Sequence, residues 1–312
     1  MIRYLIKLFF LSWLFVFSVD GSVSKHLKPA LGKGEGHQMP GIDFIYMINL
    51  DQRPEKFARS LEELLPFGIV PYRFSAVNGW ELTVEAINEV GLKFRPGMTA
   101  LMATSFPPGG RDLRSHAFMS QYGKAYFCHG MARGTIGCAL SHISVLKDAW
   151  ESGYETIWVM EDDIEVLEDP TLIPDLINRL DQLVGRENWD VLFTDQDIRT
   201  GPGEYVRASG AAKRPDMDCS LAERTSEKYT IDCQISPDFR KIGARFGAHS
   251  MIIRRSGIKK LLDFALEHEI FLPYDMDNYL MPNISRYSLT SDVVSNMPHT
   301  LSDNGTPGYE GE

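Results

Sequence analysis

The sequence is poor in the residues that mark metal knuckles and nucleic-acid-binding surfaces. Its four cysteines include no C-x-x-C pair, so a zinc knuckle is not expected. Its 32 lysines and arginines form no basic run and are outnumbered by 42 acids, which gives a net charge of −10. Nucleic acid is therefore not an expected partner. Cys219 and Cys233 flank a polar loop, and we hypothesise that they could pair in an oxidising compartment.

An apolar run of about 12 residues follows Arg3 and Lys7 at the N-terminus, shorter than a typical membrane span and typical of a signal-peptide core. We predict that residues 1–24 are a signal peptide or, if uncut, a short signal anchor that associates the chain with a membrane. Both a signal peptide and a signal anchor predict export of the chain. Its destination would be the periplasm, the endoplasmic reticulum or the Golgi lumen. Residues 25–40 are expected to be a linker, residues 41–300 the folded domain, and residues 301–312 a flexible tail.

Apolar strands and amphipathic helices alternate along the chain, which predicts an α/β fold with a mostly parallel sheet covered by helices. The predicted strands are 42–50, 72–77, 156–160, 189–194 and 245–253. The predicted helices are one capped by Asp51 with Pro54 in its first turn, then 83–90, 134–153, 171–184 and 256–268, the last capped by Ser256. Residues 96–114 are expected to be a long loop, and residues 201–240 an insertion of loops or weak hairpins.

The most informative segment is the strand at 156–160, which ends in Glu161, Asp162 and Asp163. Ligands bind at the carboxyl ends of strands in α/β sheets. Adjacent carboxylates repel one another unless a cation lies between them, and Mg²⁺ and Mn²⁺ prefer oxygen ligands. Alternate residues of a strand share a face, so Glu161 and Asp163 can hold one metal ion while Asp162 points the other way. The alternative is that these acids simply solvate the end of the strand.

Other polar groups lie at element ends or inside the helix at 134–153. The Asn49–Arg53 segment leads from a strand end into a helix N-terminus, an anion-binding position, where Arg53 could meet phosphate or a nearby acid. Gly137 would allow a close backbone approach near the start of the helix. Ser141 and His142 lie two turns further on, and His142 could equally be a structural residue bonded to a neighbouring strand.

Asp275 and Asp277 lie in the segment 273–280, which we interpret as a loop. One of them could be a general base, although Asp275 could equally cap the next helix. His249 follows two small residues, and His299 lies late in the chain. Either histidine could complete a metal shell or be structural.

Five blocks resemble one known family in order and spacing. They are IYMINLDQRPEK (45–56), FSAVNG (74–79), GTIGCALSHISVL (134–146), IWVMEDDIEV (157–166), and GAHSMIIRRSGIKKLL with PYDMDNYL (247–280). Together they are similar to glycosyltransferase family 25, which includes bacterial lipopolysaccharide galactosyltransferases and animal procollagen galactosyltransferases. Asn78 stands where the family has Asp. Residues 80–133 and 201–240 correspond to no block of the family.

The resemblance implies a GT-A-like fold, in which a mostly parallel nucleotide-binding sheet carries loop-rich acceptor-side insertions. It implies a UDP-sugar donor with galactose or glucose, a divalent Mn²⁺ or Mg²⁺, and inversion at the anomeric carbon. The acceptor would be a glycan, lipopolysaccharide or hydroxylated protein. On this resemblance Asp275 is the general base, with Asp277 behind it. It implies Glu161 and Asp163 as the metal residues, and Asn49, Arg53, Asn78, Ser141 and His142 in the donor site. We add His249 and His299 as candidate metal residues, and Leu50, Gly79 and Asp162 as candidate donor-site residues.

Two other functions remain open from the sequence. A nucleotidyltransferase on a similar fold would use the same acids to hold a nucleoside triphosphate. Such enzymes usually carry a Gly-rich loop with Lys or Arg after the first strand, whereas this chain has Asp51-Gln52-Arg53-Pro54 there. A non-catalytic glycan-binding relative is the other alternative, and the intact acid cluster argues against it.

Overall fold

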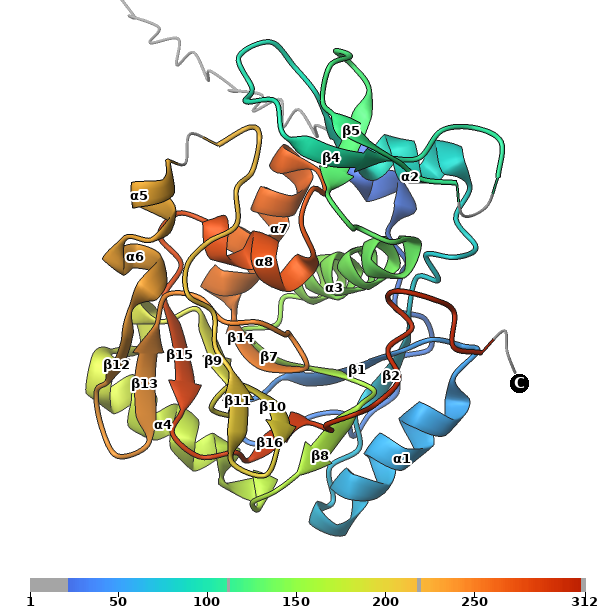
Figure 1. Ribbon diagram of the computed structural model, residues 1–312. Helices are drawn as coiled ribbons and strands as arrows, with labels where there is room; N and C mark the ends of the chain where they lie inside the picture. The colour runs from blue at the N-terminus through green and yellow to red at the C-terminus, as the bar shows by residue number, and fades with distance from the viewer. Residues whose placement is uncertain (1–21, 111–112, 218–219, 310–312) are drawn as a thin grey trace, which may run out of the picture.

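The computed structural model describes residues 22–110, 113–217 and 220–309, which are built around an eight-stranded sheet (Figure 1). The strands follow the spatial order β12-β13-β15-β9-β14-β7-β1-β2. Their bounds are β1 Phe44–Asn49, β2 Tyr72–Ser75, β7 Thr156–Glu161, β9 Val191–Phe193, β12 Asp232–Gln234, β13 Phe239–Ile242, β14 Ser250–Arg254 and β15 Arg286–Leu289. Residues 1–21, which contain most of the predicted leader, lie outside the described part of the chain.

The sheet is mixed. Strands β2, β1 and β7 run parallel, as do β15 and β9. Strand β14 lies antiparallel between β7 and β9, and β13 and β12 extend the sheet antiparallel beyond β15. The predicted α/β architecture is confirmed. Its parallel parts are the β2-β1-β7 unit and the β15-β9 pair.

Both faces of the sheet are buried, because neighbouring residues of its central strands enter two different cores. Tyr46 of β1 and Val159 of β7 belong to one core, whereas Met47 and Trp158 belong to the other. Helices α3, α7 and α8 cover the first face, and α1 and α4 cover the second (Figure 1). Continuous apolar runs such as residues 157–160 are the expected pattern for strands buried on both sides.

Eight α-helices lie in the described ranges. Their bounds are α1 Pro54–Leu64, α2 Val84–Val90, α3 Arg133–Glu151, α4 Ile173–Val184, α5 Leu221–Arg224, α6 Glu227–Thr230, α7 Arg255–His268 and α8 Tyr274–Leu280. Short 3₁₀ helices add η1 Ser22–His26, η2 Leu65–Phe67, η3 Pro170–Leu172 and η4 Arg186–Asn188. Among these described helices none has the length and apolar character needed to cross a bilayer.

Two of the predicted helix caps are wrong. The N-cap of α1 is Arg53, and Asp51 instead bonds Arg73 and the Ser75 hydroxyl. The N-cap of α7 is Arg254, while the Ser256 hydroxyl donates to Asp190 at 2.7 Å. In both cases a long-range partner competes with the local backbone for the polar side chain.

The regions expected to be loops contain small elements. Within residues 96–114 lies β4 (Met102–Ser105), which joins β3 (Leu92–Lys93), β5 (Ser115–Phe118) and β6 (Ala125–Cys128) in a four-stranded sheet. A hairpin of β10 (Ile198–Gly201) with β11 (Glu204–Val206) leads into the 201–240 insertion, which also contains helices α5 and α6. Strand β8 (Ile164–Val166) pairs with β16 (Val294–Asn296).

Residues 22–28, expected to belong to the leader and linker, pack against the domain. Val23 is fully buried, and the Lys28 backbone donates to the Ser144 hydroxyl at 2.9 Å. Cys128, Cys138 and Cys233 carry free thiols. Cys219 lies outside the described residues, so its pairing with Cys233 remains a hypothesis.

Candidate active site

Two adjacent cavities lie at the carboxyl ends of β1, β2 and β7, the edge where the sequence predicted a ligand site. The lining of the first cavity includes Asn49, Leu50, Lys56, Asn78, Gly79, Cys138, Ser141, His142, Glu161, Asp162, Asp163, Asp303 and Asn304. The second shares Cys138, Glu161, Asp163 and Asn304 with it and adds Gly247, His249, Tyr274, Asp275, His299 and others. Residues more than a hundred positions apart are thus brought to one place by the sheet.

The first cavity owes its shape to a close contact between two glycines. A Cβ atom on Gly137 of α3 would lie 2.4 Å from the Gly79 nitrogen, and one on Gly79 would lie 1.8 Å from the Arg133 carbonyl oxygen. No side chain fits at either position. The predicted close approach at Gly137 is therefore confirmed, and its partner is the loop that follows β2.

Ser141 fixes the same contact from the next turn of α3. Its hydroxyl accepts a hydrogen bond from the Val77 backbone at 2.8 Å and donates to the Gly137 carbonyl at 2.7 Å. Asn78 donates to Glu81 at 3.0 Å and to the Tyr309 hydroxyl at 2.8 Å. Both residues line the first cavity as predicted, with side chains engaged in holding its walls.

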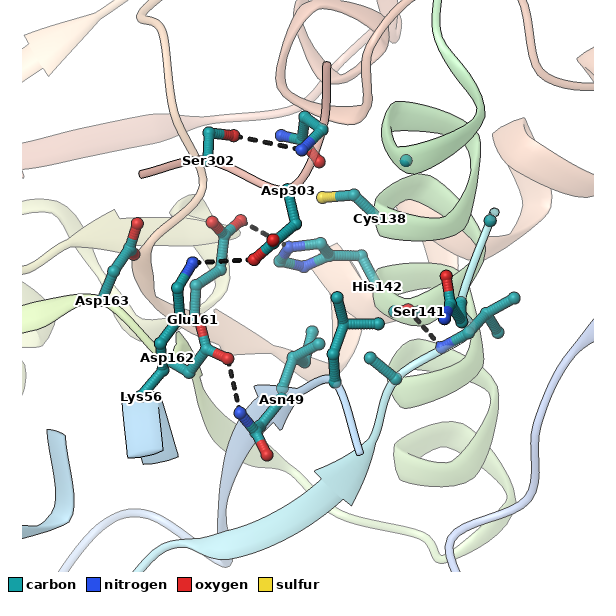
Figure 2. Close-up of a pocket in the computed structure, with 18 of the residues that line it drawn as sticks. Asn49, Lys56, Cys138, Ser141, His142, Glu161, Asp162, Asp163, Ser302 and Asp303 are labelled. Carbon is teal, nitrogen blue, oxygen red and sulfur yellow. Dashed lines mark hydrogen bonds and ion pairs between the residues drawn. The ribbon is translucent and has the colours of Figure 1, made fainter. Parts of the chain in front are cut away.

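At the end of β7, Asp162 points away from Glu161 and Asp163 (Figure 2). Asp162 accepts a hydrogen bond from Asn49 at 2.6 Å, and Asn49 also donates to the Arg53 carbonyl at 2.7 Å. Burial raises the pKa of Asp162 to about 7. The expected divergence of Asp162 from its two neighbours is confirmed, and the side chain joins the β1 and β7 ends together.

Glu161 is held by His142, whose Nε2 donates to its Oε1 at 2.9 Å. Burial alone would raise the pKa of Glu161, but the hydrogen bond and charge of His142 outweigh it and lower the pKa. The His142 ring also stacks on Tyr274, with centroids 4.2 Å apart. His142 is therefore bonded to a neighbouring strand, which agrees with its interpretation as a structural residue. It holds the carboxylate of Glu161, which lines both cavities.

Asp163 has no such partner. Its Oδ1 is buried and makes no hydrogen bond with the described residues. Burial, followed by repulsion from Glu161, raises the pKa of Asp163 to about 6. A carboxylate close to a second carboxylate, with a buried unsatisfied oxygen, is costly unless a cation approaches it.

His249 presents a second buried atom without a partner. Its Nε2 donates to Asp195 at 2.7 Å, whereas its Nδ1 has no hydrogen-bond partner among the described residues. Asp195 is fully buried and also binds Arg245 at 2.8 Å and the Ser295 hydroxyl at 2.8 Å. A carboxylate that fixes one ring nitrogen and leaves the other free is the usual arrangement behind a metal-binding histidine.

Asp275 lies in the first turn of α8 and lines the second cavity. Its two oxygens accept hydrogen bonds from the backbone of Gly247 at 2.8 Å and of Met276 at 2.9 Å. Burial raises its pKa. Gly247 adopts φ +78°, and a Cβ there would lie 2.3 Å from Ile198 and 3.1 Å from His249 Nδ1, so this glycine keeps space open beside the histidine.

Asp277 is not brought to either cavity. Its Oδ1 binds Arg214 at 2.6 Å, and the fully buried Arg214 also binds Asp216 at 2.9 Å. The segment 273–280, predicted to be a loop, is the helix α8. Asp277 therefore faces an ion-pair cluster that ties the 201–240 insertion to α7 and α8, and the geometry gives it no access to a substrate.

His299 lines the second cavity as an exposed side chain with a positive φ of 64°. Arg53 meets an acid: its Nη1 donates to Asp303 at 2.7 Å, and Lys56 binds the other Asp303 oxygen at 2.9 Å (Figure 2). Asp303 belongs to the predicted tail, so residues 302–304 form one wall of the first cavity. Whether residues 301–312 move in solution remains a prediction.

Several residues of the site had no role assigned from the sequence. Lys56 lies inside the first family block, one helical turn beyond Arg53, and Asp195 lies two residues beyond the end of β9. The position of Lys56 and Asp195 shortly after a strand was a sequence signal that could have identified them. Asp303 had none, because a polar, Gly-rich terminal segment carries no periodicity that indicates packing.

Cys138, His142 and Glu161 also place ligand atoms within 4.8 Å of one another. Burial raises the pKa of the Cys138 thiol well above its usual range, which keeps it protonated at neutral pH, and His142 is occupied by Glu161. A thiol in this state is a poor metal ligand. The oxygen and imidazole groups of the second cavity are better suited to a cation.

The fold and these cavities define an α/β protein with a ligand site at the carboxyl ends of its parallel strands. The model of glycosyltransferase family 25 (LPS biosynthesis protein) matches residues 42–278. The chain belongs to glycosyltransferase family 25.

Individual relatives are similar over part of their length. A glycosyltransferase 25 family member of Aedes aegypti is 27% identical over 169 residues, covering 54% of this chain and 23% of the relative. The inactive glycosyltransferase 25 family member 3 of Mus musculus is 25% identical, covering 54% and 24%. Procollagen galactosyltransferase 1 of Danio rerio is 26% identical, covering 40% and 17%. The chain thus spans about a quarter or less of each of these relatives.

A solved structure, titled "Crystal Structure of A197 from STIV", aligns with a TM-score of 0.29 and 14% identity over 50% of this chain and 64% of that chain. A score this low supports no inference.

Proposed function

We propose that this chain is an inverting, metal-dependent glycosyltransferase. It moves a hexose, galactose or glucose, from a UDP-sugar to a hydroxyl of a glycan, lipopolysaccharide or protein. The observation that carries the proposal is the second cavity, where the unpartnered Asp163 Oδ1 and His249 Nδ1 lie with Asp275. Family membership supports the reaction class.

The donor groups of the second cavity fit a divalent cation. Carboxylate oxygens with one imidazole suit Mn²⁺, and Mg²⁺ accepts the same oxygens. Glu161, Asp163 and His249 would hold the ion, with the exposed His299 as a further ligand. When bound, the ion would stabilise the negative charge that develops on the departing diphosphate.

The nucleotide part of the donor belongs in the first cavity. Asn49, Leu50, Asn78 and Gly79 line it from the ends of β1 and β2, and Lys56 and Arg53 supply positive charge beside it. The cavity has a volume of about 90 Å³, smaller than the roughly 300 Å³ of ordinary ligand pockets. Entry of the donor therefore requires residues 302–304 to move, and its diphosphate replaces the Asp303 carboxylate on Lys56.

Asp275 is the general base of this proposal. It takes the proton of the acceptor hydroxyl as that oxygen forms a bond to the anomeric carbon. The bond between that carbon and the diphosphate oxygen breaks in the same step, and UDP leaves with the electron pair. A single displacement of this kind inverts the anomeric configuration. The burial that raises the pKa of Asp275 makes it a stronger base than an exposed aspartate.

The proposal also places the protein in an exported compartment, the periplasm or the secretory pathway. The basic and apolar pattern of residues 1–24 supports export, and retention of this segment would add membrane association.

A non-catalytic relative is the second candidate, because the mouse protein that is 25% identical to this chain is named as inactive. Such a protein would bind a glycan or nucleotide sugar without turnover. Catalysis and binding therefore need separate measurements.

A panel of UDP-sugars tested with Mn²⁺ and with excess chelator separates the two candidates. The proposal expects one UDP-hexose to raise the melting temperature and to release UDP in the presence of Mn²⁺, with release lost in chelator. Binding without UDP release, with or without a glycan acceptor, would favour the non-catalytic candidate. Activity that is equal in chelator would contradict the metal requirement.

A further inference from the structure

A third cavity, of about 590 Å³, lies apart from the candidate active site. It is bounded by α6, the end of β13, the end of α8 and the segment that leads into β15, and it shares no lining residue with the first two cavities. Figure 1 shows α6, β13 and β15 together at the left of the molecule. Nothing in the proposed transfer reaction uses these residues.

The lining includes a buried arginine that forms no ion pair with the residues that the structure describes. Arg286 is 5% exposed, its Nη2 has no hydrogen-bond partner, and its Nη1 reaches only the Gly243 carbonyl at 3.3 Å. Burial lowers its pKa to about 10. No carboxylate of the described residues forms an ion pair with this guanidinium, and the charge of the more distant Asp190 does not offset the cost of desolvating it.

Five other buried arginines of this protein have an acidic partner that Arg286 lacks among the described residues. Arg199, Arg214, Arg240, Arg245 and Arg254 each form an ion pair with an aspartate or glutamate. Arg286 instead has the ring of Tyr279 at 6.0 Å from its guanidinium carbon. A distant aromatic ring leaves the N–H groups of the guanidinium unsatisfied.

Tyr279 adds a second unpartnered polar group to the same cavity. The residue is 2% exposed, and its hydroxyl makes no hydrogen bond with the described residues. Two lysines complete the lining, Lys228 and Lys241, both exposed and neither in an ion pair within the described ranges. Glu227 is the one acid among the lining residues. The lining thus carries three cations and a hydroxyl donor from four different elements, with one opposing charge.

We propose that this cavity binds a tetrahedral oxyanion, a phosphate or sulfate group, between Arg286, Tyr279 and the two lysines. Such a group offers enough acceptor oxygens for the guanidinium, the hydroxyl and two ammonium groups. Ile231, Ile242 and Met281 also line the cavity and provide apolar surface for the carrier of an esterified group. The inference does not depend on the proposed function, because it uses none of the residues of the candidate active site.

Binding is tested by calorimetry with inorganic phosphate and with a hexose monophosphate, in buffer that contains chelator and no other oxyanion. The expected result is saturable binding that weakens at least tenfold in the double variant Lys228→Gln/Lys241→Gln, which changes only exposed side chains. Tyr279→Phe should also weaken it. Lys259→Gln, which changes an exposed lysine of α7 that lines none of the three cavities, is the matched control and should leave this binding unchanged. Tighter binding of the hexose monophosphate would identify an ester as the occupant, and equal affinity would identify the free anion.

The variant Arg286→Met gives a second test, which distinguishes an anion-binding arginine from one that only supports the fold. Removing an uncompensated buried charge should raise the melting temperature in phosphate-free buffer while phosphate binding is lost. If Arg286→Met does not fold, the double variant Lys228→Gln/Lys241→Gln tests the proposal by itself. Absence of saturable binding, or binding that is lost in Lys56→Gln of the first cavity and kept in the lysine double variant, would overturn the proposal.

Discussion

His249 Nε2 lies 2.7 Å from Asp195 Oδ2, and both side chains are buried. Burial alone would raise the pKa of Asp195, but the charge of Arg245 and the hydrogen bonds from His249 and Arg245 outweigh it and hold the pKa well below its usual range. An ionised Asp195 can only accept, so the proton of the imidazole is on Nε2. The unpartnered Nδ1 is then available to a cation in the second cavity.

Replacement of His249 should therefore weaken metal binding and spare the fold. In His249→Ala, Asp195 keeps Arg245 and Ser295 as partners. We expect the Kd for Mn²⁺ to rise by about 10- to 100-fold, measured by calorimetry. UDP affinity without metal should stay unchanged. An unaltered Mn²⁺ affinity would remove His249 from the metal site.

The two acids of α8 should behave differently when replaced. Asp275→Asn keeps an oxygen for one of the two backbone donors but removes the base, so transfer should fall by about 10²- to 10⁴-fold with an unchanged donor Kd. Asp277→Ala should instead lower the free energy of unfolding by about 3–5 kcal/mol, because it breaks the buried ion pair with Arg214. Calorimetry, transfer rates and urea denaturation separate the effects. Equal losses of transfer at equal stability would contradict these roles.

The cluster around Arg214 also predicts a pH dependence of stability. Burial alone would raise the pKa of Asp216, but the hydrogen bond from His268 and the charge of Arg214 lower it below its unfolded value. A lowered pKa in the folded state stabilises the protein above the unfolded pKa, and this contribution is lost as pH falls through the folded pKa. Asp216→Asn should lose about 1–3 kcal/mol at pH 7 and progressively less below pH 5.

The control for that measurement is Asp263→Asn, which alters an exposed ion pair with Lys259 on α7. Its effect should be below about 1 kcal/mol at every pH. A constant difference between Asp216→Asn and the parent protein from pH 7 to pH 3 would show that the charge of Asp216 does not contribute.

Asp303 should compete with the donor. It occupies Arg53 and Lys56 beside the first cavity, so Asp303→Asn should free Lys56 and leave Arg53 with Glu55 as its acidic partner. UDP-sugar binding should tighten by roughly tenfold, or about 1.4 kcal/mol. Lys56→Met should weaken donor binding. Weaker donor binding in Asp303→Asn would mean that the segment supports the donor instead of displacing it.

The sequence was most informative where apolar residues are dense. Strands β1 and β7 and helix α3 were predicted within about three residues, because each buries a continuous face whose period is visible locally. Most of the residues predicted to surround a donor do line the first cavity, since they follow strands whose ends meet at one edge of the sheet.

The remaining features depend on contacts between distant segments. Strand β13 joins the central sheet through β15, a pairing that no local pattern reveals. Helix α8 is short and begins after a proline. Its two acids bind different neighbours: Asp275 binds the backbone of Gly247, and Asp277 binds Arg214. Asp303 reaches the first cavity from a segment with no apolar repeat. In each case the tertiary partner decides the role.

The most direct test of the account is a titration of Mn²⁺ followed by electron paramagnetic resonance in the presence of UDP, with Asp163→Asn compared with Asp175→Asn. Asp175 lies on exposed α4 surface and pairs only with Arg179 among the described residues, so it is the matched control. The account predicts tight Mn²⁺ binding in the parent protein and in Asp175→Asn, and a loss of about 100-fold or more in Asp163→Asn. Equal Mn²⁺ binding in the two variants would contradict it.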